Sequence, residues 1–176
     1  MLAGPTRIRL LRQLHDHPGQ NIAALAGALG ICRPYASQEM RRIQSRGLLK
    51  RMQRGASMIY LLRADPQVSS AAPLLKAVQR ALDTLPPWSD REMLTLAAGL
   101  AHERRIAMAQ SLMRSPKTPP QLRAEIPMAR CSYHLHLRTL TASGFATISK
   151  NVLTFRVPAH PLAKALARLL QPEQAK

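Results

Sequence analysis

Apolar side chains recur every three or four residues along the first part of the chain, which is the spacing that places them on one side of an α-helix. This pattern predicts three helices, over residues 6–15, 22–29 and 33–45. Gly30 ends the second helix, and Pro34 fits the first turn of the third because its missing N–H is not needed there. Two short helices joined by a tight turn that contains glycine form a helix-turn-helix.

The pattern changes at Gly47, which we expect to end the third helix as a left-handed cap. The following stretch, Leu48–Leu62, is rich in strand-forming residues and is interrupted by Gly55-Ala56. It therefore predicts a β-hairpin that turns at these two residues. A basic hairpin directly after a helix-turn-helix is the arrangement of a winged helix, and we call the hairpin the wing.

The same pattern returns later in the chain. LAGPTRI at residues 2–8 reappears as LAHERRI at residues 100–106, an offset of 98, and the apolar positions of the following helices recur at an offset of 97. Two further matched pairs are Gly47 with Gly144 (offset 97) and Tyr60 with Phe155 (offset 95). Because an internal repeat changes the expected fold, we predict two tandem modules.

The predicted fold is therefore mainly α with small β-hairpins, in two tandem winged helix-turn-helix domains. The first domain covers residues 1–63 and the second covers residues 89–160. Residues 64–88 form a linker with a connecting helix, and residues 161–176 form a C-terminal helix and tail. The connecting helix and the C-terminal helix each have one apolar side, which pairs the two domains, pairs two chains, or covers the helix's own domain.

Charge narrows the function. The 26 Lys and Arg residues outnumber the 9 Asp and Glu residues, for a net charge of +17, which indicates a polyanionic partner. Aromatic residues make up only 3% of the chain, which argues against a binder of single strands that stacks bases on aromatic side chains.

The outward side of the helix over Arg33–Ser45, the first reading helix, predicts the site. Arg33, Ser37 and Arg41 follow one another at intervals of four residues, with Gln38 and Arg42 beside them. Arg and Gln side chains suit base edges in the major groove, and Ser suits phosphates or bases. For an isolated helix, the alternative is a solvated basic face.

The segments LLRQL, ALAGALGI, ASQEMRRIQSRGLLKRMQRG and MIYLL, in this order between Thr6 and Leu62, resemble the ArsR-like winged helix-turn-helix transcriptional regulators. The resemblance implies sequence-specific binding of double-stranded DNA and regulation of transcription. It places these residues where that family reads DNA: Arg33, Tyr35, Ser37, Gln38 and Arg41. On the wing, Arg51 and Arg54 are further predicted contacts, with Arg54 at the tip.

The second reading helix, Arg130–Ala142, is less basic and more apolar than the first. Its predicted DNA contacts are Arg130, Ser132, His134 and Arg138, with Lys150 at the tip of the second wing. We therefore expect the first module to read most of the sequence. Regulators of this type bind as symmetric dimers, so the two modules form an intrachain pseudo-dimer, or two chains form a homodimer.

Other classes of function find little support. No glycine-rich phosphate loop follows a strand and no motif pairs a nucleophile with a base, so we expect no enzyme and no cofactor. Cys32 and Cys131 form neither a disulfide framework nor a clustered metal site, so we expect no metal. Without a secretory signal or a membrane-length apolar run, the expected location is the cytoplasm.

One alternative within the same fold stays open. Tandem winged helices also occur in plasmid replication initiators, which bind DNA, and in chromosome-segregation proteins, where they bind partner proteins. A protein-binding module has less need of a basic outward face on its reading helix.

Overall fold

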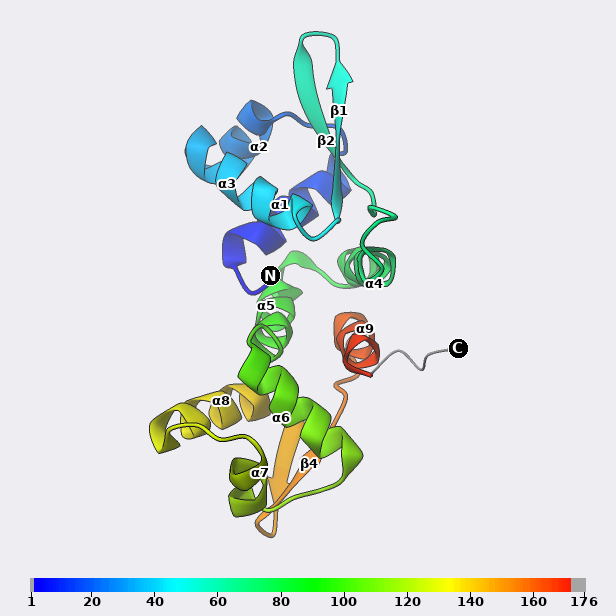
Figure 1. The fold of residues 1–176 in the computed structure, drawn as a ribbon. Coiled ribbons are helices and arrows are strands. Elements are labelled where there is room, and N and C mark those ends of the chain that lie inside the picture. Colours follow the sequence, from blue (N-terminus) through cyan, green and yellow to red (C-terminus); the bar gives the residue numbers. More distant parts are fainter. Residues whose placement is uncertain (1, 172–176) are drawn as a thin grey trace. The chain divides into compact units, whose positions relative to one another are not determined.

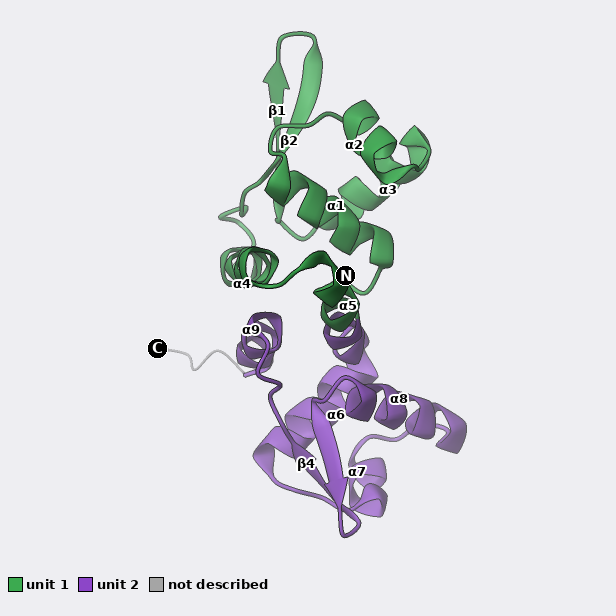
Figure 2. Ribbon diagram, turned by 180° about the vertical axis from the view of Figure 1, so that it is seen from behind, with its two compact units in different colours: residues 1–94 green, residues 95–176 purple. Residues whose placement is uncertain are grey.

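The computed structural model describes residues 2–171, which divide into two compact units at Leu94 and Thr95 (Figure 2). It is mainly helical with two antiparallel two-stranded hairpins, so the predicted fold class, mainly α with small β-hairpins, is confirmed. The predicted tail over residues 172–176 lies outside the described residues. We describe each unit by itself.

The first unit begins with three helices, α1 (Pro5–Asp16), α2 (Ile22–Leu29) and α3 (Arg33–Gln44), which pack against one another (Figure 1). Asn21 caps α2 by accepting a hydrogen bond from the N–H of Ala24 at 2.9 Å. Gly30 ends α2 with φ +65°, a left-handed conformation that suits glycine. The apolar stripes bury the following side chains almost completely: Ile8, Leu11, Leu14, Leu25, Ala36, Met40 and Ile43.

The first wing consists of β1 (Leu49–Arg54) and β2 (Ser57–Leu62), which turn at Gly55 and Ala56 as predicted. A backbone bridge fixes its base to the residues before α2. The Tyr60 N–H donates to the Gln20 oxygen at 3.0 Å, and the Gly19 N–H donates to the Tyr60 oxygen at 3.1 Å. This bridge joins Gln20 to Tyr60, so α2, α3 and most of the wing lie in the stretch of chain that it closes.

The turn between α3 and the wing differs from the prediction. The last helical residue of α3 is Gln44, and Ser45, in right-handed conformation, occupies the C-cap. Gly47 is left-handed, with φ +71°, but it lies two residues after the cap. A Cβ at Gly47 would come within 3.0 Å of side-chain atoms of Ala71 and Val68, so a close approach adds to the need for glycine.

The first unit continues with α4 (Ala71–Thr84), a 3-10 turn η1 (Pro87–Ser89) and the start of α5 (Asp90–Gly99). The Arg12 guanidinium of α1 binds the end of α4 and the start of α5. It donates to both carboxylate oxygens of Asp90 at 2.7–3.1 Å, to the Leu82 oxygen at 3.3 Å and to the Leu85 oxygen at 3.1 Å. One side chain thus satisfies carbonyls at the end of α4 and a carboxylate at the start of α5.

The second unit contains the end of α5, then α6 (Glu103–Arg114), α7 (Pro119–Glu125), α8 (Arg130–Ala142), β3 (Ala146–Ser149), β4 (Val152–Phe155) and α9 (Pro161–Leu170). The strands turn at Lys150 and Asn151, with φ values of +47° and +62°. Two successive positive φ values are typical of the type I′ turns that connect hairpin strands.

A backbone bridge also closes this hairpin, here between Lys117 and Leu153. The Leu153 N–H donates to the Lys117 oxygen at 2.7 Å, and the Lys117 N–H donates to the Leu153 oxygen at 3.0 Å. Leu153 therefore occupies the structural place that Tyr60 has in the first unit, and the sequence match of Tyr60 with Phe155 is wrong by two residues. The second hairpin has strands of four residues instead of six, so its second strand reaches the bridge two residues earlier than the sequence alignment predicts.

Histidines tie α6 to α8. The His102 Nδ1 caps α6 by accepting from the N–H of Arg104 at 3.1 Å. Its ring lies 4.5 Å from that of His136 on α8, and the His136 Nδ1 is 3.2 Å from the Arg105 Nη1. Because arginine can only donate, the His136 Nδ1 accepts and carries no proton. Burial lowers the pKa of His136, and the charges of His102, Arg105 and Arg104 lower it further.

This pKa shift predicts a dependence of stability on pH. Since the unfolded chain protonates His136 near the ordinary pKa of about 6.5 and the folded chain only at lower pH, the free energy of unfolding falls as the pH drops below about 6.5. We expect His136→Gln, which keeps an acceptor for Arg105, to flatten the fall in thermal midpoint between pH 7.5 and 5. His134→Gln, an exposed neighbour on the same helix, is the control. Equal pH profiles for both variants and the parent would contradict the prediction.

Candidate nucleic-acid interface

The outward face of α3 carries the predicted reading residues. Arg33, Gln38 and Arg41 are exposed, and Ser37 is half-buried. They project outward because Ala36, Met40 and Ile43 turn the opposite side of the helix into the core. The structure thus gathers these four residues on one side of a short helix that begins directly after the Gly30 turn.

Two other predicted residues of α3 have partners inside the first unit. The Tyr35 hydroxyl lies 3.3 Å from the Thr6 Oγ1, so this side chain leans toward α1 although it is 41% exposed. Arg42 forms an ion pair with Glu39, whose side chain is only 3% exposed and also pairs with Arg7 of α1 at 2.9 Å. Tyr35 and Arg42 therefore do not lie free beside Arg33 and Arg41.

Sequence reasoning missed the place of Glu39. In the sequence, Glu39 is the single acid in the basic stretch from Arg33 to Arg54. Its spacing holds the signal, because residue 39 follows Ala36 by three positions and precedes Ile43 by four, which places it beside the buried stripe. A carboxylate at such a position needs a cationic partner, and Arg7 and Arg42 supply it.

The first wing extends the positive surface. Lys50, Arg51 and Arg54 are exposed on β1, and Arg54 stands next to the turn. The Gln53 Nε2 donates to the Gly55 oxygen at 2.8 Å, which stabilises the tip. From Arg33 to Arg54 the chain has seven Lys and Arg residues and a single acid, Glu39, so the field of this region attracts phosphates.

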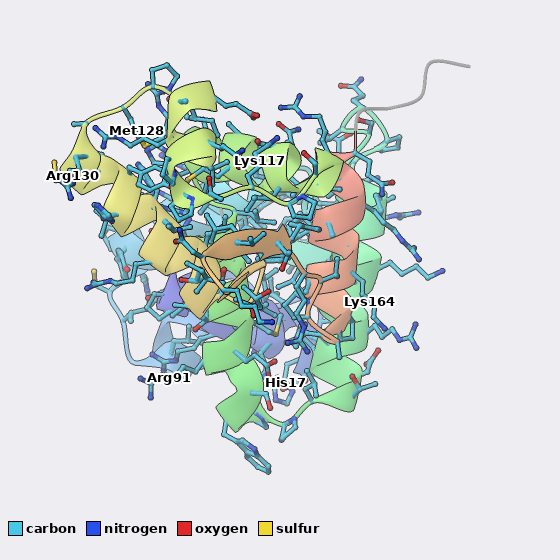
Figure 3. The ribbon with its side chains drawn as sticks, turned by 90° about the horizontal axis from the view of Figure 1, so that it is seen from below. His17, Arg91, Lys117, Met128, Arg130 and Lys164 are labelled. Atoms are coloured by element: carbon cyan, nitrogen blue, oxygen red, sulfur yellow. The ribbon has the colours of Figure 1, made fainter. Side chains whose placement is uncertain are left out.

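The second unit presents a weaker version of this surface. Arg130, His134 and Arg138 are exposed on α8, and Ser132 is half-buried; Figure 3 shows Arg130 at the start of the helix. Lys150 is exposed at the hairpin turn.

Apolar side chains interrupt this second surface. Leu135 on α8 is 55% exposed and Ile148 on β3 is 56% exposed. Tyr133 turns inward and donates its hydroxyl to the Pro119 oxygen at 2.9 Å. Between Arg130 and Lys150 the chain has three Lys and Arg residues and no acid, so the surface is positive but sparse.

The chain's two cysteines, Cys32 and Cys131, are exposed, at the start of α3 and of α8 respectively. Among the described residues, no three His, Cys, Asp or Glu side chains gather in a way that could hold a metal ion. No helix in the described part of the chain is long and apolar enough to cross a bilayer.

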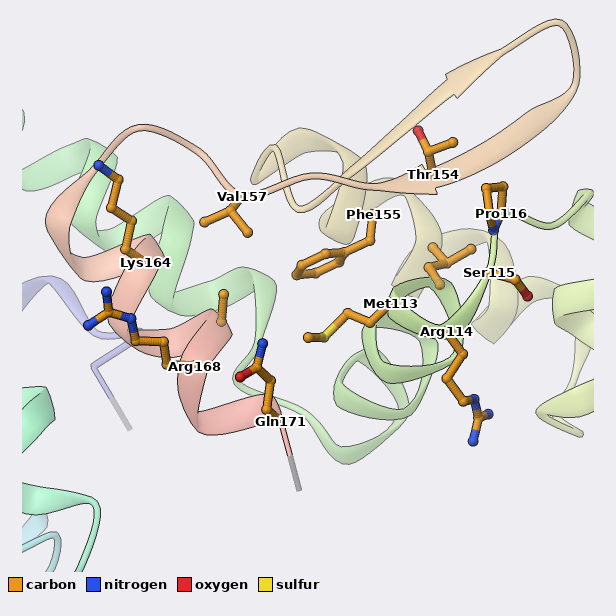
Figure 4. A pocket seen from close by; sticks show the side chains of 12 residues that line it. Met113, Arg114, Ser115, Pro116, Thr154, Phe155, Val157, Lys164, Arg168 and Gln171 are labelled. Carbon is orange, nitrogen blue, oxygen red and sulfur yellow. The ribbon is translucent and has the colours of Figure 1, made fainter. Parts of the chain in front are cut away.

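A cavity of about 550 Å³ in the second unit is separate from this surface. Met113, Phe155 and Val157 form apolar walls, and Lys164 and Arg168 of α9 stand at its side (Figure 4). None of the described residues that line it belongs to α8 or to the hairpin turn. The cavity therefore adds no group to the candidate interface.

Comparison with known proteins identifies the type of the first unit. Residues 5–55, from α1 to the turn of the wing, match the sequence model of the MarR family. The matched family is thus MarR rather than the ArsR-like one that the sequence resembles. No curated protein and no solved structure matches the chain. The MarR family consists of regulatory winged-helix proteins that bind DNA, so residues 5–55 are similar to the winged-helix domain of such proteins.

Proposed function

We propose that this protein regulates transcription by binding double-stranded DNA in a sequence-specific manner. In this proposal α3 enters the major groove, where Arg33, Ser37, Gln38 and Arg41 meet base edges and phosphates. The first wing follows the backbone or minor groove with Arg51 and Arg54. The observation that carries the proposal is the gathering of these exposed side chains on one outward helix face with a basic wing beside it.

We also propose that the second unit is a second winged helix. Three likenesses support this: in each unit three consecutive helices lead into the hairpin (α1–α3 and α6–α8), a bridge joins the hairpin to the residue before the N-cap of the middle helix, and a left-handed glycine precedes the hairpin. The glycines are Gly47 and Gly144, with φ values of +71° and +76°. The chain then acts as an intrachain pseudo-dimer or as a homodimer. The ArsR-like regulators that the sequence resembles and the MarR family that residues 5–55 match both have a winged-helix domain.

The two modules are unequal in this proposal, and the first does most of the sequence reading. The first offers Arg33 and Arg41 on its helix and three exposed cations on its wing. The second offers Arg130, His134 and Arg138, with the exposed Leu135 between them. The second module then holds the first on the duplex and contributes a weaker half-site.

The first prediction concerns salt. Because exposed cations replace counterions on the phosphates, the logarithm of affinity should fall linearly with the logarithm of salt concentration, by about 0.9 per neutralised phosphate. Fluorescence anisotropy with a labelled random-sequence duplex between dilute and physiological salt measures this slope. An affinity that does not change with salt would overturn DNA binding through this surface.

The second prediction compares the two reading helices. Once a preferred site has been selected from a random duplex library, Arg41→Ala should lower the preference for it over a scrambled duplex by about 1–3 kcal/mol, the worth of a good base contact. Arg138→Ala should weaken binding to both duplexes by similar factors. If Arg138→Ala costs as much discrimination as Arg41→Ala, the modules are equal readers.

A further inference from the structure

The middle of α3 contains a buried carboxylate in a protein that is otherwise strongly basic. The Glu39 side chain is 3% exposed. The Arg7 Nε of α1 lies 2.9 Å from its Oε2, and the Arg42 Nη1 donates to its Oε1. Each carboxylate oxygen therefore has its own guanidinium.

The surroundings of this ion pair are crowded on the α1 side. The Arg7 guanidinium lies over Gly4, where an added Cβ would collide with it. The Arg7 side chain is 19% exposed, whereas that of Arg42 is 51% exposed. A carboxylate removed from water is stable only when charges and hydrogen bonds compensate it, so Glu39 holds both arginines close.

We propose that Glu39 is the internal counterion of the reading helix, and that it keeps Arg42 from binding DNA phosphates. This inference rests on the proposed function, and it revises the charge of the candidate interface, where Arg42 is one of the seven Lys and Arg residues from Arg33 to Arg54. Arg7, Glu39 and Arg42 together carry a single positive charge, although the sequence suggests that Arg42 adds a full charge to the reading surface. Of the three arginines of α3, Arg33 and Arg41 then face the duplex, and Glu39 acts on DNA only through the position of Arg42.

The test measures the number of phosphates that the protein neutralises, which is read from the salt dependence of affinity. If Glu39 had only a structural role, replacing it would not increase this number. The probe is a labelled 30-base-pair duplex of random sequence, so that no operator is needed. The variants of the full chain are Arg42→Gln, Glu39→Gln, the double variant, and Arg54→Gln as the matched control at the wing. Gln at 42 keeps a donor for Glu39, and Gln at 39 keeps the shape of the side chain; circular dichroism checks that each variant folds.

We expect Arg54→Gln to reduce the salt slope by about 0.9, the loss of one phosphate contact, and Arg42→Gln to leave it within about 0.3 of the parent. Glu39→Gln should release Arg42 and steepen the slope by up to about 0.9, and the double variant should return it to the parental value. At low salt, Glu39→Gln should therefore bind the random duplex more tightly than the parent does.

Two results would overturn the inference. One is a reduction of the salt slope in Arg42→Gln as large as that in Arg54→Gln. This comparison leaves Glu39 unchanged, so it remains decisive even if Glu39→Gln does not fold. The other is a folded Glu39→Gln variant whose slope equals that of the parent. A parent protein that does not bind the duplex at any salt concentration would instead contradict the proposed function.

Discussion

The position of α1 is the constraint on which the first unit depends, and arginines fix it. Arg7 pairs with Glu39 of α3, Arg9 donates to the Leu29 oxygen at the end of α2 at 3.1 Å, and Arg12 holds Asp90 and the end of α4. Helix C-termini leave carbonyls without intrahelical partners, and guanidinium groups satisfy them with several donors from one planar group. These polar contacts thus add to the apolar core by joining α1 to α3 and to the ends of α2 and α4.

The second unit uses the same chemistry on α6. Arg104 donates to the Pro127 oxygen at 3.0 Å, in the segment before α8, and Arg105 donates to the Gly99 oxygen at 3.1 Å while its Nη1 contacts His136. Some of the positively charged side chains therefore stabilise the fold through contacts within the protein. The net charge therefore overstates the number of cations that a polyanion could contact, because some arginines are bound to groups of the protein itself.

The sequence predicted the helices and hairpins well because their signals are local. Gly30, the apolar stripe of α3 and the turn at Gly55-Ala56 lie where the sequence pattern predicted them. The sequence did not predict the ion pairs of Glu39 or the pairing of Leu153 with Lys117, because each depends on a partner distant in the chain. Tyr35 illustrates the same limit for the candidate site: its place on the helix is predictable, but its approach to Thr6 depends on the angle between α1 and α3.

The bridge between Gln20 and Tyr60 has a consequence for how the first module opens. Since the base of the wing and the start of α2 share these hydrogen bonds, neither can separate from the other without exposing both. The reading helix and the wing are thereby closed into one loop of chain, and local opening of this loop is a single cooperative event. A fragment that ends before Tyr60 lacks this closure, so the smallest unit that keeps both hydrogen bonds between the wing and the start of α2 must include Tyr60.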